Sequence, residues 1–329
     1  MTIAVDTMEM TYREAVWHAL HDAMAADERV VLLGEDVGAA GGVFKVTDGL
    51  LPKFPGRVID TPIAENSFVG MATGMAITGW RPVVEIMFAE FLHVAADSIV
   101  NDMATLPFMS GGQTSVPVTI RTAGGAGNNF GPQHSATGES WYMHVPGLRI
   151  AAAASPASAY ALLRAAIELD EPTLFIEHKR RYLRRGTVAL GDGAVARVGE
   201  AEIVRDGRDV TVAATMLMVD HALEAAETLA AEGIDAEVVD MRWISPLDVN
   251  AVGESVGRTR RLVVAEEQVH DGGWGATLVS RLAQSGAPWA APPISVSMPR
   301  VPVPASPRLE AATVPSADRI AAAIRRAVA

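Results

Sequence analysis

Two side chains stand at points where α/β proteins commonly place chemistry. Glu65 follows a predicted strand at 58–60 and begins a predicted helix rich in small residues. Ligand crevices of α/β sheets lie at such strand ends, although a glutamate there also stabilises a helix through the helix dipole. His134 closes a glycine-rich segment at 123–135, in which the backbone can approach a ligand closely. Histidine transfers protons near neutral pH, so both residues are candidates for acid–base chemistry, and both can equally be structural.

Two further segments combine charge with polar chemistry. The run at 177–185 gathers five Lys and Arg side chains in an acidic chain, and it indicates either a solvated domain edge or a surface for an anionic partner. The segment at 266–275 holds acids and a histidine among glycines, but their spacing matches no metal-ligand pattern. The glycine-rich segment at 123–135 lacks both the dinucleotide fingerprint and the Gly-Lys-Ser/Thr sequence of a phosphate loop.

The composition narrows the classes of function. The chain has 329 residues, 27 basic and 39 acidic side chains, a net charge of −12, 49% hydrophobic residues and no cysteine. The missing cysteine excludes disulfides, thiolate metal sites and a cysteine nucleophile, and the acidic balance argues against nucleic-acid binding. The most apolar stretch, 68–80, is too short to cross a membrane, and the N-terminus shows no signal pattern. We therefore expect a cytoplasmic protein with no membrane partner.

Apolar runs alternate with helical patterns twice along the chain, which predicts an α/β protein with two mostly parallel sheets flanked by helices. We expect a first domain at 1–185, a glycine- and charge-rich linker at 186–208, and a second domain at 209–329. Thr11 and Glu14 are spaced as the capping box of a first helix. The expected strands are 30–33, 83–87, 116–121, 148–152, 173–177, 210–214, 236–240, 262–266 and 294–298, and the expected helices include 67–77, 157–169, 219–232, 246–253, 274–283 and 317–327.

Eight short motifs follow one another in an order that matches a known family. They are Leu33-Gly34-Glu35-Asp36-Val37, Gly42-Val43-Phe44-Lys45-Val46-Thr47, Asp60-Thr61-Pro62-Ile63-Ala64-Glu65, Arg81-Pro82-Val83-Val84-Glu85, Gln133-His134-Ser135, His144-Val145-Pro146-Gly147-Leu148, Glu177-His178-Lys179 and Asp271-Gly272-Gly273-Trp274-Gly275-Ala276. Each motif alone is weak, but their order and spacing are specific. Together they resemble the β subunit of the E1 component of 2-oxoacid dehydrogenase complexes, a family that includes pyruvate, branched-chain 2-oxoacid and acetoin dehydrogenases.

The resemblance implies a transketolase-like fold, with a pyrimidine-binding domain followed by a transketolase C-terminal-like domain. It implies that Glu65 hydrogen-bonds N1′ of the aminopyrimidine of thiamine diphosphate and favours the imino tautomer that removes the thiazolium C2 proton. It implies that His134 faces the active-site funnel and assists acyl transfer to lipoamide, and that the Phe91 ring lies against the pyrimidine. The segment at 136–141 departs from the usual family pattern, so the resemblance does not define the acceptor or substrate pocket there.

The same resemblance implies partners and metal ions. Mg²⁺ and diphosphate would be held by a separate E1 α subunit in an α₂β₂ assembly, because Gly191-Asp192-Gly193 is not followed by the asparagine of the family's Mg²⁺ motif. A lipoyl-bearing E2 acyltransferase would accept the acyl group. A backbone K⁺ site is also implied, with carbonyl ligands from Val118, Ala166, Ile167, Leu169 and Glu171.

The expected activity is oxidative decarboxylation of a 2-oxoacid, catalysed only together with the α subunit. Pyruvate is the first choice of substrate, acetoin the second and branched-chain 2-oxoacids the third. Two alternatives stay open: the C-terminal half of a split transketolase, and a non-catalytic scaffold that only docks E2.

Overall fold

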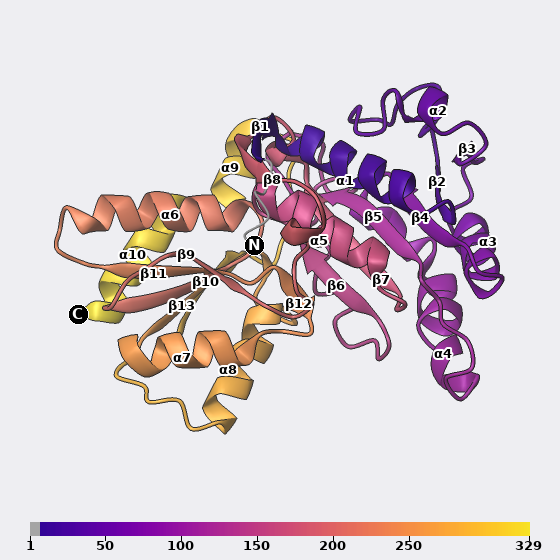
Figure 1. Cartoon of the computed structure of the whole chain (residues 1–329). Helices are drawn as coiled ribbons and strands as arrows, with labels where there is room; N and C mark the ends of the chain where they lie inside the picture. Colours follow the sequence, from indigo (N-terminus) through magenta and orange to yellow (C-terminus); the bar gives the residue numbers. More distant parts are fainter. Residues whose placement is uncertain (1–6) are drawn as a thin grey trace.

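The computed structural model describes residues 7–329, so the first six residues of the predicted first domain lie outside the described residues. Two α/β units follow one another along the chain, each with a sheet flanked by helices (Figure 1). The predicted fold class is confirmed.

The first unit is built on a seven-stranded sheet in the order β12-β6-β7-β5-β4-β2-β3. The six strands from β6 to β3 are parallel, and β12 joins the edge of β6 in antiparallel register. The bounds are β2 Val30–Gly34, β3 Val58–Asp60, β4 Arg81–Ile86, β5 Thr119–Gly124, β6 Arg149–Ala152, β7 Thr173–His178 and β12 Trp243–Ser245.

Successive residues of each strand point to opposite faces of this sheet, and each face carries its own helices. Leu32 packs in the hydrophobic cluster that contains α1 (Tyr12–Ala26) and α5 (Pro156–Glu168). Its neighbour Leu33 packs in the cluster that contains α3 (Glu65–Ile77). Thr11 caps α1 through the predicted box with Glu14. The short helices α2 and α4 span Leu50–Lys53 and Leu106–Met109.

The second unit has a five-stranded sheet in the order β14-β13-β10-β11-β9. The bounds are β9 Glu202–Arg205, β10 Val210–Ala214, β11 Ala236–Asp240, β13 Leu262–Val269 and β14 Ile294–Met298. Helices α6 (Leu217–Ala230) and α10 (Ala317–Val328) cover one face, and α7 (Val249–Thr259) and α8 (Trp274–Gln284) cover the other (Figure 1). The short helix α9 spans Pro307–Thr313.

The two units are not independent. The segment predicted as a linker contains β9 and most of β8 (Arg185–Ala189), and β8 pairs antiparallel with β1 (Thr7–Thr11). Strand β12 lies within the predicted second domain but belongs to the first sheet. One hydrophobic cluster runs from the α3 face into the α7 and α8 face.

One predicted helix is misplaced along the chain. The helix expected at 246–253 is α7, which begins at Val249 because the Asp248 side chain accepts a hydrogen bond from the Ala251 amide at 2.9 Å. It continues to Thr259.

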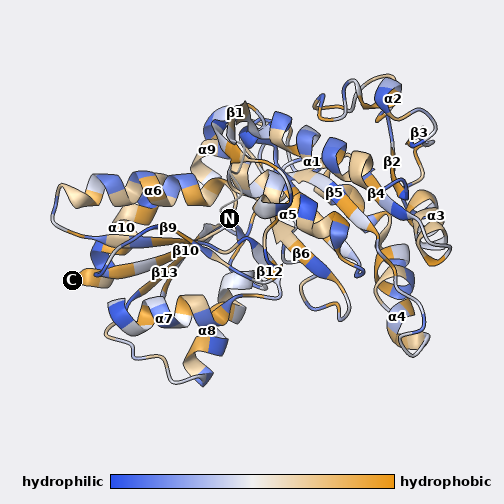
Figure 2. Ribbon diagram, viewed as in Figure 1, coloured by the Kyte–Doolittle hydropathy of each residue, from blue (hydrophilic) through white to orange (hydrophobic). Residues whose placement is uncertain are grey.

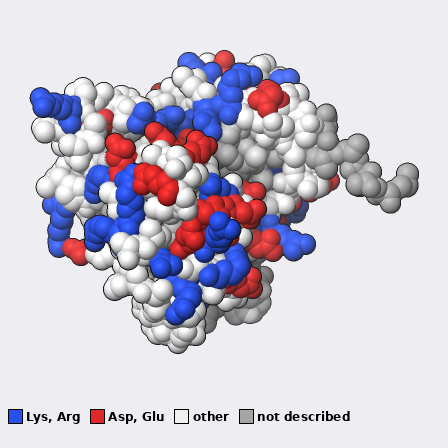
Figure 3. All heavy atoms as spheres, turned by 90° about the vertical axis from the view of Figure 1, so that its left-hand side faces the viewer, with Lys and Arg blue, Asp and Glu red and all other residues white. Residues whose placement is uncertain are grey.

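The surface of the second unit is mixed in charge. Figure 3 shows basic and acidic side chains side by side on this face, and Arg325 of α10 pairs there with Glu232. Figure 2 shows hydrophilic and hydrophobic residues alternating along the helices, as expected of helices that cover a sheet on one side. Among residues 7–329, no helix is long and apolar enough to cross a membrane.

Candidate active site

The candidate residues gather at the carboxyl edge of the first sheet. The strand order reverses between β2 and β4, because β3 lies on one side of β2 and β4 on the other. Crevices at such reversal points are the usual ligand sites of open α/β sheets. Glu35 follows β2, Glu65 follows β3, and Phe88 and Phe91 follow β4. The glycine-rich loop with His134 follows β5 at the same edge.

Four carboxyl groups lie near this reversal point, those of Glu35, Asp36, Glu65 and Glu85. Glu65 is the first residue of α3 and is 6% exposed. Burial, together with the charges of Glu65, Asp36 and Glu85, raises the pKa of Glu35 to about 7. The Glu35 Oε1 atom is buried and has no hydrogen-bond partner among residues 7–329. Position 35 was not singled out from the sequence as a site residue, although it too directly follows a buried strand.

A buried row of charged side chains crosses three strands of the first sheet next to this edge. Glu85 on β4, Arg121 on β5 and Glu177 on β7 pair across neighbouring strands, with Arg121–Glu177 distances of 2.8 and 2.9 Å. The Tyr182 hydroxyl donates to Glu177 at 2.9 Å. Burial alone would lower the pKa of the Arg121 guanidinium, but Glu177 and Glu85 raise it on balance. The row therefore links β4, β5 and β7 through their side chains.

The His134 ring is half-buried and packs against two aromatic rings that also contact each other, since the Phe88 and Phe91 centroids are 5.7 Å apart. Its centroid is 4.5 Å from that of Phe88 and 5.5 Å from that of Phe91, both in edge-on geometry. The structure thus brings together the predicted residues His134 and Phe91. Glu65 lies at the same sheet edge, within the group of carboxyl groups around Glu35.

The glycines that begin this loop serve the fold. A side chain at Gly125 would come within 2.1 Å of His178 Nε2, and one at Gly127 within 2.1 Å of the Arg180 side chain. Both glycines also have positive φ, at +88° and +100°. The sequence predicted that this backbone approaches a ligand closely. At Gly125 and Gly127 it instead approaches side chains of the same protein.

The basic run at 177–185 is not a solvated edge throughout. Lys179 and Arg181 are buried, at 5% and 3% exposure, and Arg181 pairs with Asp220 of α6. His178 is fully buried and hydrogen-bonds Glu267 of β13 at 2.9 Å. These side chains join the two units, so the interpretation as a solvated edge is wrong for the buried members.

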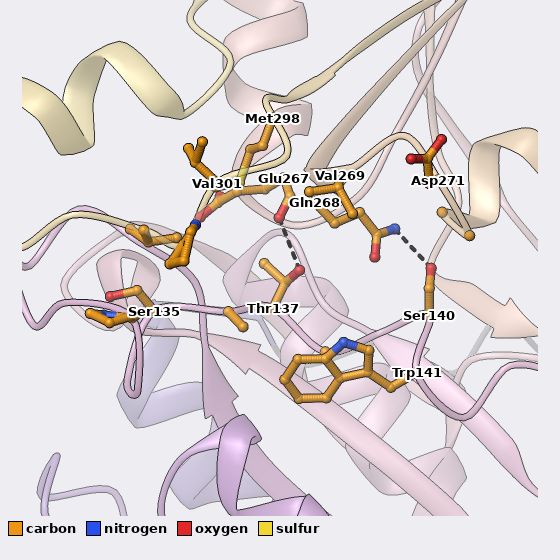
Figure 4. Close-up of a pocket in the computed structure, with 17 residues that line it drawn as sticks. Ser135, Thr137, Ser140, Trp141, Glu267, Gln268, Val269, Asp271, Met298 and Val301 are labelled. Carbon is orange, nitrogen blue, oxygen red and sulfur yellow. Dashed lines mark hydrogen bonds between the residues drawn. The ribbon is translucent and has the colours of Figure 1, made fainter.

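A cavity of about 250 Å³ opens behind the His134 loop, between 132–141 and the segments 267–273 and 298–303 (Figure 4). Thr137 donates to the Glu267 carbonyl at 3.1 Å, and the Gln268 side chain donates to Ser140 at 2.8 Å. The segment that departs from the family pattern therefore lines this cavity.

Glu139 belongs to the same departing segment. It is fully buried, and neither carboxyl oxygen has a hydrogen-bond partner in the described part of the chain. Burial raises its pKa to about 8. This acid was not predicted as a notable residue.

The carbonyls predicted to hold K⁺ all accept protein hydrogen bonds. Arg81 donates to Ile167 at 3.1 Å and Leu169 at 3.0 Å. Donors for the other three are Thr119 to Ala166, the Thr173 amide to Val118, and the Thr173 hydroxyl to Glu171. Arg81 therefore supplies positive charge at two of the five carbonyls, and the K⁺ site stays a prediction.

One other possible metal position is unsupported. The Gly191-Asp192-Gly193 triplet lies in an exposed turn, where Asp192 pairs with Arg164. Within residues 7–329, no three His, Asp or Glu side chains are grouped so that they could hold a metal ion.

Comparison with known proteins places both units in one family. The family model "Transketolase, pyrimidine binding domain" matches residues 8–184, and "Transketolase, C-terminal domain" matches residues 199–320. The chain is 41% identical to the mitochondrial pyruvate dehydrogenase E1 component subunit beta-2 of Oryza sativa subsp. japonica, over 97% of this chain and 86% of that protein. It is also 41% identical to the acetoin:2,6-dichlorophenolindophenol oxidoreductase subunit beta of Cupriavidus necator, over 97% of each. A solved structure described as a split gene transketolase, inactive beta4 tetramer, superimposes with a TM-score of 0.80 at 26% identity, over 97% of this chain and 98% of that one.

Proposed function

The chain belongs to the transketolase-like family of E1 β subunits of 2-oxoacid dehydrogenase complexes, and we propose that its crevice completes a thiamine diphosphate site shared with an E1 α subunit. The observation that carries this proposal is the buried Glu65 carboxyl at the strand reversal of the first sheet, among acids that raise the pKa of Glu35. As a family member the chain is an oxidoreductase subunit. The assignment of pyruvate as the substrate is part of the proposal, and acetoin is the alternative.

The residues present fit the pyrimidine end of the cofactor. Glu65 offers a carboxyl group out of bulk water, Phe91 offers a half-buried ring, and Glu35 has an unpartnered buried oxygen in the described structure. When bound, thiamine diphosphate supplies the electron sink for decarboxylation. We assign Mg²⁺ and the diphosphate to the α subunit, since Gly191-Asp192-Gly193 is not followed by the asparagine of the family's Mg²⁺ motif.

The residues of this chain then have distinct tasks. The Glu65 carboxyl holds a proton at N1′ of the pyrimidine and so selects its tautomer. Phe91 orients the ring and excludes water. His134, packed against Phe88 and Phe91, would donate a proton to one lipoyl sulfur while the electron pair released by decarboxylation attacks the other sulfur and breaks the disulfide.

An exposed apolar surface supports the α partner. Ile63, immediately before α3, is 84% exposed, and Phe108 and Met109 of α4 are 90% and 72% exposed. Both α3 and α4 contact the segment at 98–103, and large exposed apolar side chains on adjoining elements favour a protein interface. We propose that the α subunit covers them, and that the lipoyl domain of E2 approaches the completed site. A cytoplasmic location also remains a proposal.

The test uses the chain assembled with its α subunit. Glu65→Gln should lower turnover by at least about 100-fold, because a lost proton-transfer group typically costs that much. Glu28→Gln, an exposed glutamate on another surface, is the matched control. Near-normal turnover in Glu65→Gln would refute the N1′ role.

The second variant separates the two half-reactions. His134→Ala should lower lipoyl acylation more than decarboxylation measured with an artificial electron acceptor. Equal losses would remove His134 from acyl transfer. Comparing kcat/KM for pyruvate and acetoin decides between the two substrates, and turnover of a sugar phosphate instead would identify a split transketolase.

A further inference from the structure

The peptide unit between His134 and Ser135 is held at both ends by opposite charges. The Lys179 ammonium donates to the His134 carbonyl oxygen at 2.6 Å. The Glu90 carboxylate accepts from the Ser135 amide at 2.5 Å and from the Ala136 amide at 2.6 Å. Both charged groups lie on elements other than the loop: Glu90 on the short 3₁₀ helix after β4, and Lys179 directly after β7.

The polarity of this arrangement matches the peptide dipole. Each peptide unit carries a dipole of about 3.5 D, with its negative end at the oxygen and its positive end at the N–H. A cation at the oxygen and an anion at the N–H therefore both stabilise the same orientation of the unit, through charge-assisted hydrogen bonds. Fixing this peptide plane limits rotation about the bonds on either side of it, and one of these bonds sets where the His134 side chain points.

The same lysine also reaches the ring against which His134 packs. Lys179 Nζ lies 5.6 Å from the centroid of Phe88, and the His134 centroid lies 4.5 Å from that same ring. Burial lowers the pKa of Lys179, and the charges of Glu90 and Glu267 oppose this shift in part. The resulting pKa is about 8, so the charged form predominates at neutral pH. Lys179 thus contacts both the backbone of His134 and the Phe88 ring on which the imidazole packs.

Among residues 7–329, the Glu90 side chain makes hydrogen bonds only to this loop. Its Oε1 atom makes both hydrogen bonds to the loop, and its Oε2 atom is buried without a partner within the described residues. The geometry points to Glu90 and Lys179 as positioning residues that hold the His134 peptide so that the imidazole faces the aromatic pair. This inference rests on the proposed role of His134 in acyl transfer, and it adds the groups that place it.

Amide exchange in the assembled enzyme tests the positioning directly. Glu90→Ala should increase hydrogen exchange at the Ser135 and Ala136 amides by at least about tenfold, since a hydrogen bond to a charged group is lost. Glu90→Gln keeps an acceptor oxygen and should stay within about threefold of the parent. Glu227→Ala, which removes an exposed acid on α6, should leave the exchange unchanged. Lys179→Met is a second variant, which keeps most of the side-chain volume and removes the donor.

Activity provides the second readout. Glu90→Ala should lower lipoyl acylation at least about fivefold more than decarboxylation with an artificial acceptor, and Glu90→Gln should restore it. The inference is overturned if exchange is unchanged in Glu90→Ala and Lys179→Met, if both half-reactions fall equally, or if Glu90→Gln is as impaired as Glu90→Ala. If His134→Ala leaves acylation intact, the proposed function of His134 fails, and faster exchange in Glu90→Ala would still support the positioning of the loop.

Discussion

Glu139 should make the protein less stable as the pH rises. It is fully buried, and burial raises its pKa from 4.5 to about 8. The folded chain therefore binds a proton that the unfolded chain has released, so stability is lost between about pH 4.5 and pH 8. At about 1.4 kcal/mol per pH unit, the loss relative to acid pH is about 3 kcal/mol at pH 7 and about 1.4 kcal/mol at pH 5.5.

Replacing Glu139 by glutamine removes this dependence with little change in volume. An unfolding entropy of about 2 cal/mol/K per residue over the chain converts 1 kcal/mol into about 1.5 °C. Glu139→Gln should therefore raise Tm by about 5 °C at pH 7 and by about 2 °C at pH 5.5, measured by calorimetry on the enzyme assembled with its α subunit. Glu227→Gln, at an exposed position, should change Tm little at either pH. A Tm gain that is equal at both values, or larger at pH 5.5, would show that Glu139 is ionised in the folded protein.

Two other features lead to predictions of their own. Gly125→Ala should lower Tm by more than Gly56→Ala and should also slow lipoyl acylation. The methyl group added at Gly125 would meet His178 within 2.1 Å, whereas Gly56 has a similar φ of +79° and open space around it. Calorimetry and the acylation assay check this, and equal effects of the two variants would contradict it. Exchanging K⁺ for Na⁺ should shift Tm by less than about 1 °C, because Arg81 already supplies positive charge at the Leu169 carbonyl; a stabilisation specific to K⁺ would show that the carbonyls hold the ion.

The parts of the fold that could be predicted from the sequence are those with a clear apolar run or helical periodicity. The strands 210–214, 236–240 and 294–298 have the bounds expected from their apolar runs. Strand β12 was not predicted, because its three residues pair with a strand some 90 positions earlier and carry no periodic signal of their own.

Part of the candidate site could also be predicted from the sequence. Glu65 was singled out because it follows a strand end, and His134 because it closes a glycine-rich loop that leaves a strand; sequence can indicate both. Glu90 and Lys179 were not assigned to the site, because they act on the backbone of residues about 45 positions away. Only the folded sheet edge brings these charges to the loop, and the amides and carbonyl that they hold have no side-chain signature.

Strand β12 also constrains how this chain can be shortened. It is contributed from beyond residue 208 and pairs with the outer side of β6. A fragment truncated at that point would expose a row of free backbone donors and acceptors along β6, ready to recruit strands from other molecules. A recombinant N-terminal fragment should therefore aggregate, whereas one that retains the chain through Ser245 keeps this edge sealed.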